Sequence, residues 1–595
     1  MAAKRRKSVR PSRASHLKKL DTLLHTTRSV GLLAREELVS VIVDCTARRK
    51  VSPKIDAWGG GCSGIAGTEN TIVARVPRGK LAALARMKDV RYVEASTRLK
   101  LHCDRAHVSS GLVRGNSRTV SETGAGVLVG VVDTGIDVKH PAFRSNGKTR
   151  IVDYLDQFTD RELDASAIDA GAADDVTDPV GHGTHAAGIA AGNGAGSPGR
   201  RLKGVAPEAD LAIVKTTLES ADILRGIAHV FDLAGKRGQP CVVNCSFGGH
   251  FGGHDGTTIV ERTIDELSGP GKIVVVSAGN EGVDPIHAHT RLRGDGASPA
   301  RWEAAFHLKP RMVDTGGGSQ ELGVLGLQVW HQREDALRIA LHAPGGQIVE
   351  APEEGLSELD FDSFFVSVSR QVHPYSGDPF VTFQLFAAAQ TAWLTGWRLV
   401  VEEVSPGSAK VGAVHAWIGD GAEGNFVTGA TFEYLVGMPA TAYSAVAVAS
   451  YVTRNEWSSR DPAHPTVRLE ALQLESLSEF SSRGPTRDGQ NKPEVTAPGE
   501  WLLAPLSSAA PPGELPLFTR VSDIDYAALR GTSMSAPYVT GALALLLEKD
   551  GTIDWAEAKR RIMKSTRQDE NTGVCWNRDW GYGKLDVARL LSVEP

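Results

Sequence analysis

Three uninterrupted runs of apolar residues, two before residue 285 and one after residue 435, predict buried strands. Residues 127–132, 273–276 and 445–449 are apolar or small throughout, without the polar alternation of a half-exposed strand. Strands of a parallel sheet read in this way because helices cover both faces. The pattern therefore predicts an α/β fold, with a mostly parallel, doubly wound sheet.

Helix-like segments follow two glycine-rich turns. Residues 184–191 are mostly small or apolar, and Gly192 is expected to end this helix. Residues 538–548 form a second such segment, with Pro537 expected in its first turn. Both segments would pack on the predicted sheet.

A different pattern fills residues 285–435. Short apolar runs alternate with turn signals such as Pro344-Gly345-Gly346, and the segment is too long for a structureless loop. This spacing predicts an inserted all-β sandwich or jelly roll, which would either stabilise the fold or bind a ligand. The predicted strands are 322–329, 337–342, 364–368, 380–385, 397–401 and 414–418.

The N-terminal part is predicted to form a small α+β domain over residues 21–105. Its expected elements are strands 38–44, 70–77 and 90–94 and a helix at 78–87. Residues 1–20 are strongly basic and predict a solvated, disordered tail, with nuclear targeting or a nucleic-acid arm as the alternative. No apolar segment of a secretory signal follows them, which favours a cytoplasmic location.

Composition narrows the class of protein. A chain of 595 residues is too long for one core and should contain several domains. Its net charge of −4 gives no reason to expect a nucleic-acid partner, and no apolar run is long enough to predict a membrane span. The six cysteines lack a Cys-x-x-Cys spacing, which argues against a disulfide or zinc framework.

Three glycine-rich segments carry the residue types of an acyl-transfer site. They are Asp133-Thr134-Gly135, Gly181-His182-Gly183-Thr184-His185 and Gly531-Thr532-Ser533-Met534-Ser535. A serine hydroxyl is a weak nucleophile, so a neutral imidazole must take its proton and an anion must orient that imidazole. Ser533, His182 and Asp133 are the candidates for these roles. His185 is interpreted as structural, since no carboxylate-rich partner motif indicates a metal pair.

The order Asp, His, Ser, with these surrounding motifs, resembles the subtilisin-like serine proteases, the subtilase family (peptidase family S8). The resemblance implies a serine endopeptidase that hydrolyses a protein or peptide substrate through an acyl-enzyme. It also gives Asn280 the role of oxyanion-hole donor. The implied substrate-binding residues lie in two segments, Ser246, Phe247 and Gly248, and Ser277, Ala278 and Gly279.

The resemblance also suggests roles for the other parts of the chain. Residues 21–105 are similar to the family's propeptide, which is a folding chaperone and intramolecular inhibitor; self-cleavage would then fall near residues 101–103. A permanently fused structural domain is the alternative. The inserted segment 285–435 resembles the jelly-roll insertion of Csp-like bacterial subtilases. Residues 106–284 and 436–595 would together form the catalytic domain.

Two departures from the family pattern affect the expected function. Many relatives have an acidic calcium ligand where this chain has Ala142, so we expect no cofactor, and a calcium ion remains the open alternative at an impaired site. Residues 216–222 are also short for the loop that normally supplies a second edge strand beside the substrate. A catalytically silent or propeptide-blocked scaffold with a regulatory or binding role is the alternative function.

Overall fold

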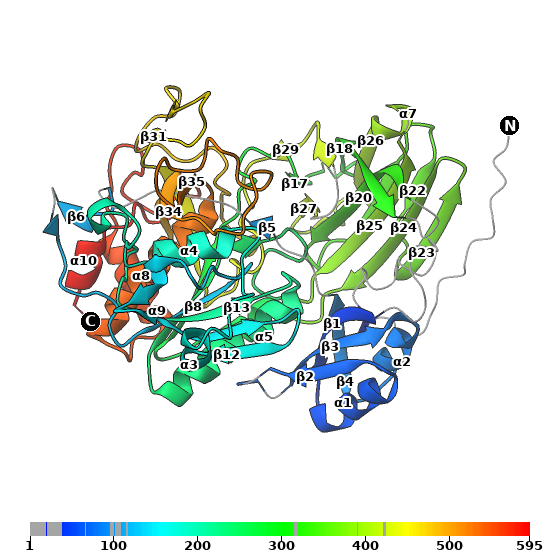
Figure 1. The fold of residues 1–595 in the computed structure, drawn as a ribbon. Coiled ribbons are helices and arrows are strands. Elements are labelled where there is room, and N and C mark those ends of the chain that lie inside the picture. Colours follow the sequence, from blue (N-terminus) through cyan, green and yellow to red (C-terminus); the bar gives the residue numbers. More distant parts are fainter. Residues whose placement is uncertain are drawn as a thin grey trace.

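The computed structural model describes residues 19–20, 38–65, 67–68, 70–95, 100–101, 109–114, 117–294, 296–314, 319–389, 391–419 and 424–594. A large α/β body carries a β-rich insertion on one side, and the small N-terminal domain lies below the insertion (Figure 1).

The α/β body is built on an eight-stranded sheet of order β12-β11-β13-β8-β14-β16-β30-β33. All neighbouring strands are parallel except β12, which pairs antiparallel with β11. The central strands are almost completely buried, as their continuous apolar runs predicted. The strand bounds are β8 (Leu128–Asp133), β11 (Ile151–Asp156), β12 (Arg161–Asp164), β13 (Asp210–Lys215), β14 (Cys241–Cys245), β16 (Lys272–Ser277), β30 (Val446–Val452) and β33 (Val495–Glu500).

Helices cover both faces of this sheet, and each face has its own hydrophobic core. One core joins the sheet to α4 (His182–Ala191), α8 (Thr532–Lys549), α9 (Trp555–Ser565) and α10 (Val587–Ser592). The other joins it to α5 (Ser220–Arg237) and α6 (Ile259–Leu267). The predicted doubly wound α/β fold is confirmed.

Helix α8 begins earlier than its sequence pattern predicted. It starts at Thr532, so Ser533 lies in its first turn and Pro537 lies inside the helix rather than at its start. Pro537 has no N–H, so the carbonyl of Ser533, four residues earlier, lacks its helical donor. The helix tolerates Pro537 because this carbonyl accepts a hydrogen bond from the Ser246 hydroxyl at 2.6 Å instead.

The insertion consists of two antiparallel sheets that enclose a separate hydrophobic core. Alternating apolar residues on the strands fill this core, as in other β sandwiches. The larger sheet contains β23 (Gly355–Phe361), β24 (Phe364–Val372), β25 (Pro379–Ala388), β20 (Ser319–His331), β27 (Ala413–Ile418), β17 (His287–Arg291) and β29 (Ala430–Thr431), with β19 (Pro310–Asp314) on β20. The smaller contains β22 (Ile348–Glu350), β21 (Leu337–His342), β26 (Trp397–Glu403), β18 (Arg301–Leu308) and β28 (Gly424–Phe426).

The N-terminal domain contains an antiparallel sheet of order β2-β3-β1-β4. The predicted helix at 78–87 is shorter in the structure, with a 3-10 turn at Arg78–Lys80 followed by α2 (Leu81–Ala85). Two further elements, α1 and β2, were not predicted. The bounds are β1 (Leu38–Cys45), α1 (Arg48–Ala57), β2 (Gly61–Gly64), β3 (Thr71–Pro77) and β4 (Val90–Ala95).

The N-terminal domain shares a core with the α/β body. Ile42, Val73 and Tyr92 belong to the same hydrophobic cluster as the residues of α5 and α6. The Glu94 carboxylate also accepts a hydrogen bond from the Ile259 N–H, at the start of α6, at 3.0 Å. A carboxylate in this position satisfies a free backbone donor and interacts favourably with the helix dipole.

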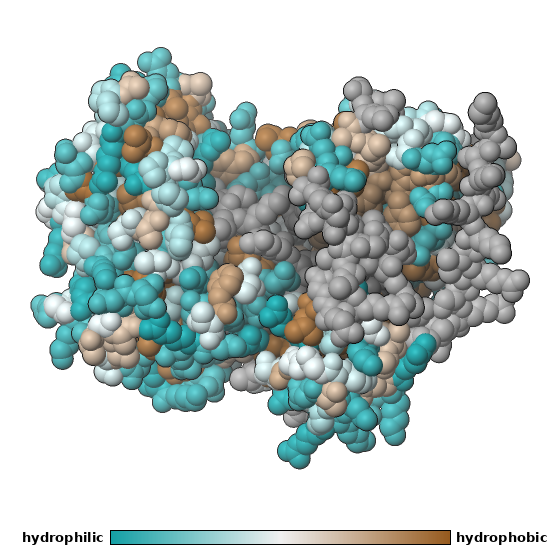
Figure 2. Space-filling view, turned by 45° about the vertical axis from the view of Figure 1, so that its right-hand side comes forward, coloured by the Kyte–Doolittle hydropathy of each residue, from teal (hydrophilic) through white to brown (hydrophobic). Residues whose placement is uncertain are grey.

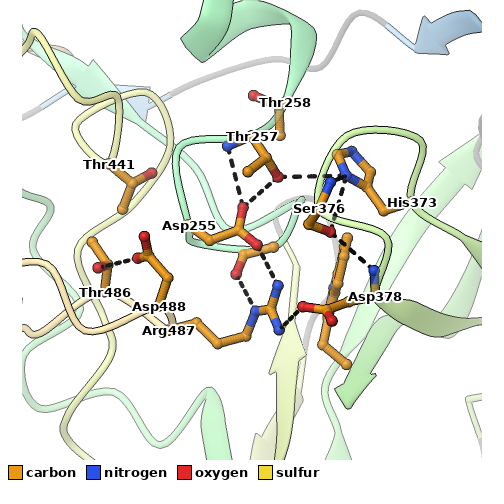
Figure 3. Close-up of polar contacts among 12 residues, drawn as sticks. Asp255, Thr257, Thr258, His373, Ser376, Asp378, Thr441, Thr486, Arg487 and Asp488 are labelled. Carbon is orange, nitrogen blue, oxygen red and sulfur yellow. Dashed lines mark hydrogen bonds and ion pairs between the residues drawn. The ribbon is translucent and has the colours of Figure 1, made fainter. Parts of the chain in front are cut away.

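Polar side chains join the insertion to its two neighbours. The Tyr375 hydroxyl of the insertion donates to Asp44 of the N-terminal domain, and the Arg262 guanidinium of α6 lies 3.8 Å from the centre of the Tyr375 ring. Arg487 of the α/β body forms ion pairs with Asp255 and, at 2.7 Å, with Asp378 of the insertion (Figure 3). Burial raises the pKa of Asp255, but the Arg487 charge and the hydrogen bond from the Thr257 hydroxyl together outweigh burial, and the pKa lies below its usual value.

On the face shown in Figure 2, apolar residues occur in small groups among polar ones. None of the helices within the described residues is long and apolar enough to span a membrane.

Candidate active site

Asp133 and His182 form a hydrogen-bonded pair at the carboxyl edge of the main sheet. Asp133 is the last residue of β8, and His182 is the first residue of α4. His182 Nδ1 lies 2.7 Å from Asp133 Oδ1, and both side chains are buried. This contact fixes the imidazole ring and favours a proton on Nδ1, which leaves Nε2 as the basic nitrogen.

A buried carboxylate that sequence reasoning missed, Asp178, joins the segments that carry this pair. Its Oδ1 accepts from the Thr134 hydroxyl and the Gly181 N–H, each at 2.9 Å. Its Oδ2 accepts from the Thr184 N–H at 2.9 Å and from the Thr184 hydroxyl at 2.8 Å. Asp178 therefore holds the end of β8 against the start of α4. Its position four residues before His182 was the only sequence signal for this role. The signal was insufficient, because the hydrogen-bond partners of Asp178 come together only in the folded chain.

Close approach of α4 to the Asp133 turn requires glycine at position 183. A Cβ atom there would overlap the carbonyl oxygen of Gly135 and lie 3.1 Å from the Asp133 Cβ. The Gly183 N–H donates to the Thr134 hydroxyl at 2.9 Å. The glycine after the histidine is therefore a condition for the His182–Asp133 contact.

Ser533 lies in the first turn of α8 and is fully buried. Its hydroxyl donates to the Ser246 carbonyl oxygen at 2.7 Å, while the Ser246 hydroxyl donates back to the Ser533 carbonyl. These reciprocal bonds join the nucleophile candidate to the strand segment beside it. The first N–H groups of a helix have no partner within the helix and can bind a developing negative charge.

Asn280 lies in a turn directly after β16, close to the start of α8. Its Oδ1 accepts from the Thr532 N–H at 2.9 Å and contacts the Thr532 hydroxyl at 3.0 Å. The carbonyl end of the Asn280 amide is thereby fixed, and its NH₂ end is available as a donor. Gly279, with φ of +115°, lets the chain turn sharply before Asn280.

The predicted substrate strand is already paired with a segment of the N-terminal region. Phe247–Gly248 forms β15, which pairs antiparallel with β5 (Lys100–Leu101). The partners are Phe247 with Leu101 and Gly248 with Lys100. In Figure 1, β5 lies inside the α/β body, away from the rest of the N-terminal domain. The backbone of β15 can therefore bind an extended segment by strand addition.

The other predicted subsite residues lie around this strand. Ser277 ends β16, and its hydroxyl is 3.4 Å from the Phe247 carbonyl. Ala278 accepts from the Gly437 N–H at 3.0 Å, which brings the chain leaving the insertion beside the oxyanion turn. The Phe247 side chain is fully buried in the core formed with α5 and α6.

The loop that would supply a second edge strand beside the substrate is short, as the sequence indicated. β13 ends at Lys215 and α5 begins at Ser220. Only residues 216–219 connect them, and they contain no strand.

Among the residues that the structure describes, no cluster of potential metal ligands includes Asp133 or His182. His185 is fully buried, and its Nε2 lies 3.0 Å from the Ala527 carbonyl. Burial lowers the pKa of His185 to about 3. The Ala142 carbonyl accepts from the Arg150 guanidinium at 3.0 Å. The absence of a cofactor and the impaired calcium site remain predictions.

One group of potential metal ligands lies elsewhere in the described part of the chain. Asp153, Glu162 and His229 place their ligand atoms within 4.8 Å of one another. His229 Nε2 is bonded to Asp153 Oδ2 at 2.7 Å, which accounts for this arrangement without an ion.

The doubly wound sheet, with an aspartate, a histidine and a helix-initiating serine at its carboxyl edge, is the arrangement of an α/β serine hydrolase. The chain belongs to the subtilase family: residues 124–306 and 419–583 match the family model described as "Subtilase family". The two matched segments flank most of the insertion. The predicted subtilisin-like fold is confirmed, and the family to which the chain belongs is one of serine peptidases.

Curated relatives agree with this assignment. C5a peptidase of Streptococcus pyogenes is 26% identical over 515 residues, covering 79% of this chain and 40% of the relative. Minor extracellular protease Vpr of Bacillus subtilis is 22% identical over 490 residues, covering 79% of this chain and 52% of the relative. The chain therefore spans about half or less of the length of these relatives.

A solved structure also matches the fold over most of its own length. The CspB protease of Clostridium perfringens aligns with a TM-score of 0.64 and 25% sequence identity, covering 79% of this chain and 95% of that chain.

Proposed function

We propose that this chain is a serine endopeptidase in which Ser533 is the nucleophile, His182 the general base and Asp133 the group that orients His182. The observation that carries the proposal is the buried 2.7 Å contact between His182 Nδ1 and Asp133 Oδ1, on a subtilase fold that has Ser533 at the start of α8. An oriented, neutral imidazole is what an unactivated serine hydroxyl requires.

The proposed reaction uses side chains and backbone groups of the chain and one water molecule. The Ser533 hydroxyl leaves the Ser246 carbonyl and passes its proton to His182 Nε2 as its oxygen attacks the peptide carbonyl carbon. The carbonyl oxygen becomes negatively charged and is bound by the Asn280 amide and the Ser533 N–H. His182 then protonates the leaving amine, and a water molecule, activated by His182, hydrolyses the acyl-enzyme.

The N-terminal domain is proposed to act as an intramolecular inhibitor that the enzyme cleaves from itself. Three observations support this role: β5 pairs with the substrate strand β15, Ser533 is fully buried, and the domain shares a core with α5 and α6. An antiparallel segment ending at Leu101 would approach the nucleophile from the acyl side of a peptide bond. The predicted cut near 101–103 lies mostly among residues outside the described ones.

The alternative is a propeptide-blocked scaffold that binds rather than cleaves. The same burial of Ser533 supports it, as does the engagement of the Ser533 hydroxyl by the Ser246 carbonyl. In this case the groups are present but a peptide does not reach them.

Intact-mass measurement of the purified wild type beside Ser533→Ala tests the proposal. We expect a wild type cut near residues 101–103 and a mutant that stays full length. The N-terminal fragment should remain bound to the larger one, because cleavage of one peptide bond leaves the hydrophobic core that the two parts share intact. If both proteins stay full length, self-processing is refuted, and a peptide-hydrolysis assay of the full chain decides between the enzyme and the blocked scaffold.

A further inference from the structure

A carboxylate directly behind the proposed oxyanion donor holds the turn that carries it. Glu281 Oε2 accepts from the Asn280 N–H at 2.7 Å and from the Ser482 hydroxyl at 3.2 Å. The same oxygen lies 3.2 Å from His250 Nε2, and the His250 side chain is only 3% exposed. The backbone of Asn280 is therefore bonded to Glu281, which in turn contacts the buried ring of His250.

A stack of flat rings continues from His250 into the insertion. The centres of the His250 and His254 rings are 5.2 Å apart, and those of His254 and Trp417 are 4.3 Å apart with planes only 6° from parallel. Trp417 is a fully buried residue of β27, and the ring of His287 on β17 lies 4.6 Å from it. The rings thus connect Glu281 to the larger sheet of the insertion.

Hydrogen bonds fix the two inner rings of this stack. His254 Nδ1 lies 2.9 Å from the Val436 carbonyl, and Trp417 Nε1 donates to the Tyr434 carbonyl at 2.9 Å. Both acceptors lie in the segment that leaves the insertion, where Gly437 also bonds to the oxyanion turn.

The loop that carries His250 and His254 is tied to the insertion at further points. The Gly252 N–H donates to Gln328 Oε1 of β20 at 2.8 Å. Figure 3 shows Asp255 of the same loop facing the Arg487 guanidinium, which also contacts Asp378 of the insertion. The loop cannot shift without breaking contacts to the inserted sheet.

We propose that Glu281 and His250 are positioning residues for Asn280, and that the insertion holds them in place through Trp417. This inference depends on the proposed function, since it assigns a role in the same reaction. An oxyanion donor acts only if it is held within a few tenths of an ångström of the developing charge. The glycine-containing turn at Gly279 has little rigidity of its own. The Thr532 contacts hold the Asn280 side chain, and Glu281, backed by the ring stack, holds its backbone.

Steady-state kinetics on a peptide substrate tests the role of Glu281. Rates are expressed per Ser533 labelled by a fluorophosphonate, so that misfolded protein is not counted. Glu281→Ala should lower kcat on the order of tenfold with KM little changed, because a displaced donor is lost mainly from the transition state. Glu281→Gln keeps an oxygen acceptor and should restore most of the rate.

A double-mutant cycle separates positioning from general damage. In an Asn280→Ala background, Glu281→Ala should cause almost no further loss of kcat, because the group that it positions is gone. An equal loss of kcat in both backgrounds, or an unchanged kcat for Glu281→Ala alone, would overturn the assignment.

Matched tryptophan variants test the role of the insertion. Trp417→Leu removes the ring from the stack and should lower kcat, whereas Trp417→Phe keeps a ring and should lower it less. Trp397→Leu is the control, since Trp397 is equally buried but lies in the core of the insertion, away from the stack. Equal kcat values for Trp417→Leu and Trp397→Leu would refute the coupling. A wild type that neither labels at Ser533 nor hydrolyses peptide would refute the proposed function itself, and this inference with it.

Discussion

Acidification should destabilise this protein through histidines that the fold buries in their neutral form. His185 and His254 are both fully buried, and burial lowers the pKa of each to about 3. For His254, the charge of the nearby His250 contributes to this lowering of the pKa. An unfolded histidine titrates near pH 6.5. Between pH 3 and 6.5 the unfolded chain therefore binds more protons than the folded one, so stability is complete above this window and falls as the pH decreases through it.

The size of the effect follows from the same values. At pH 5 each of these histidines should cost about 2 kcal/mol of unfolding free energy, since pH 5 lies about 1.5 units below the unfolded pKa. Denaturant unfolding of the Ser533→Ala protein at pH 7 and pH 5, followed by tryptophan fluorescence, measures this loss without autolysis.

Replacing a single histidine tests the reasoning. His185→Asn should be less stable at pH 7, because it loses a well-packed ring, but its loss of stability between pH 7 and pH 5 should be smaller than the parent's by about 2 kcal/mol. His464→Gln is the control, since the His464 side chain is largely exposed. An unchanged pH dependence in His185→Asn would refute the account of that site.

Further substitutions test the packing and the domain contacts. Gly183→Ala should abolish peptide hydrolysis, since its Cβ would overlap the Gly135 carbonyl. The Cβ of Gly235→Ala on α5 would meet open space, so this substitution should raise the unfolding free energy by about 0.5–1 kcal/mol. Peptide hydrolysis and thermal unfolding of both variants check these expectations. Arg487→Met should lower the unfolding free energy by about 3–5 kcal/mol, because it leaves two carboxylates without their shared cation. Glu94→Ala removes the acceptor at the start of α6 and should weaken retention of a cleaved N-terminal domain by about 1 kcal/mol, which the dissociation rate of the fragment measures.

The α/β core was predictable because its signals are local. The apolar run before Asp133 and the glycines around His182 indicate a strand end and a helix start through residues that are close together in the sequence. The resemblance to propeptides implied an intramolecular inhibitor, but the pairing of β15 with β5 was not itself predicted. Its register depends on contacts between segments that lie far apart in the sequence.

The features that sequence reasoning missed are those that depend on distant partners. The start of α8 at Thr532 depends on the Ser246 hydroxyl, which supplies the hydrogen bond that Pro537 cannot donate. Helix α1 contains Pro53, a residue that argues against a helix, yet it packs Val51 and Ile55 into the core of the N-terminal domain.

The central claim is that Ser533 is a nucleophile activated by His182, and a fluorophosphonate probe tests it most directly. The probe forms a covalent bond only with an activated serine, and peptide mapping locates the label. The account predicts labelling of the wild type at Ser533 and a strong loss of labelling in His182→Ala. A wild type that does not label, or that labels equally well without His182, would contradict it.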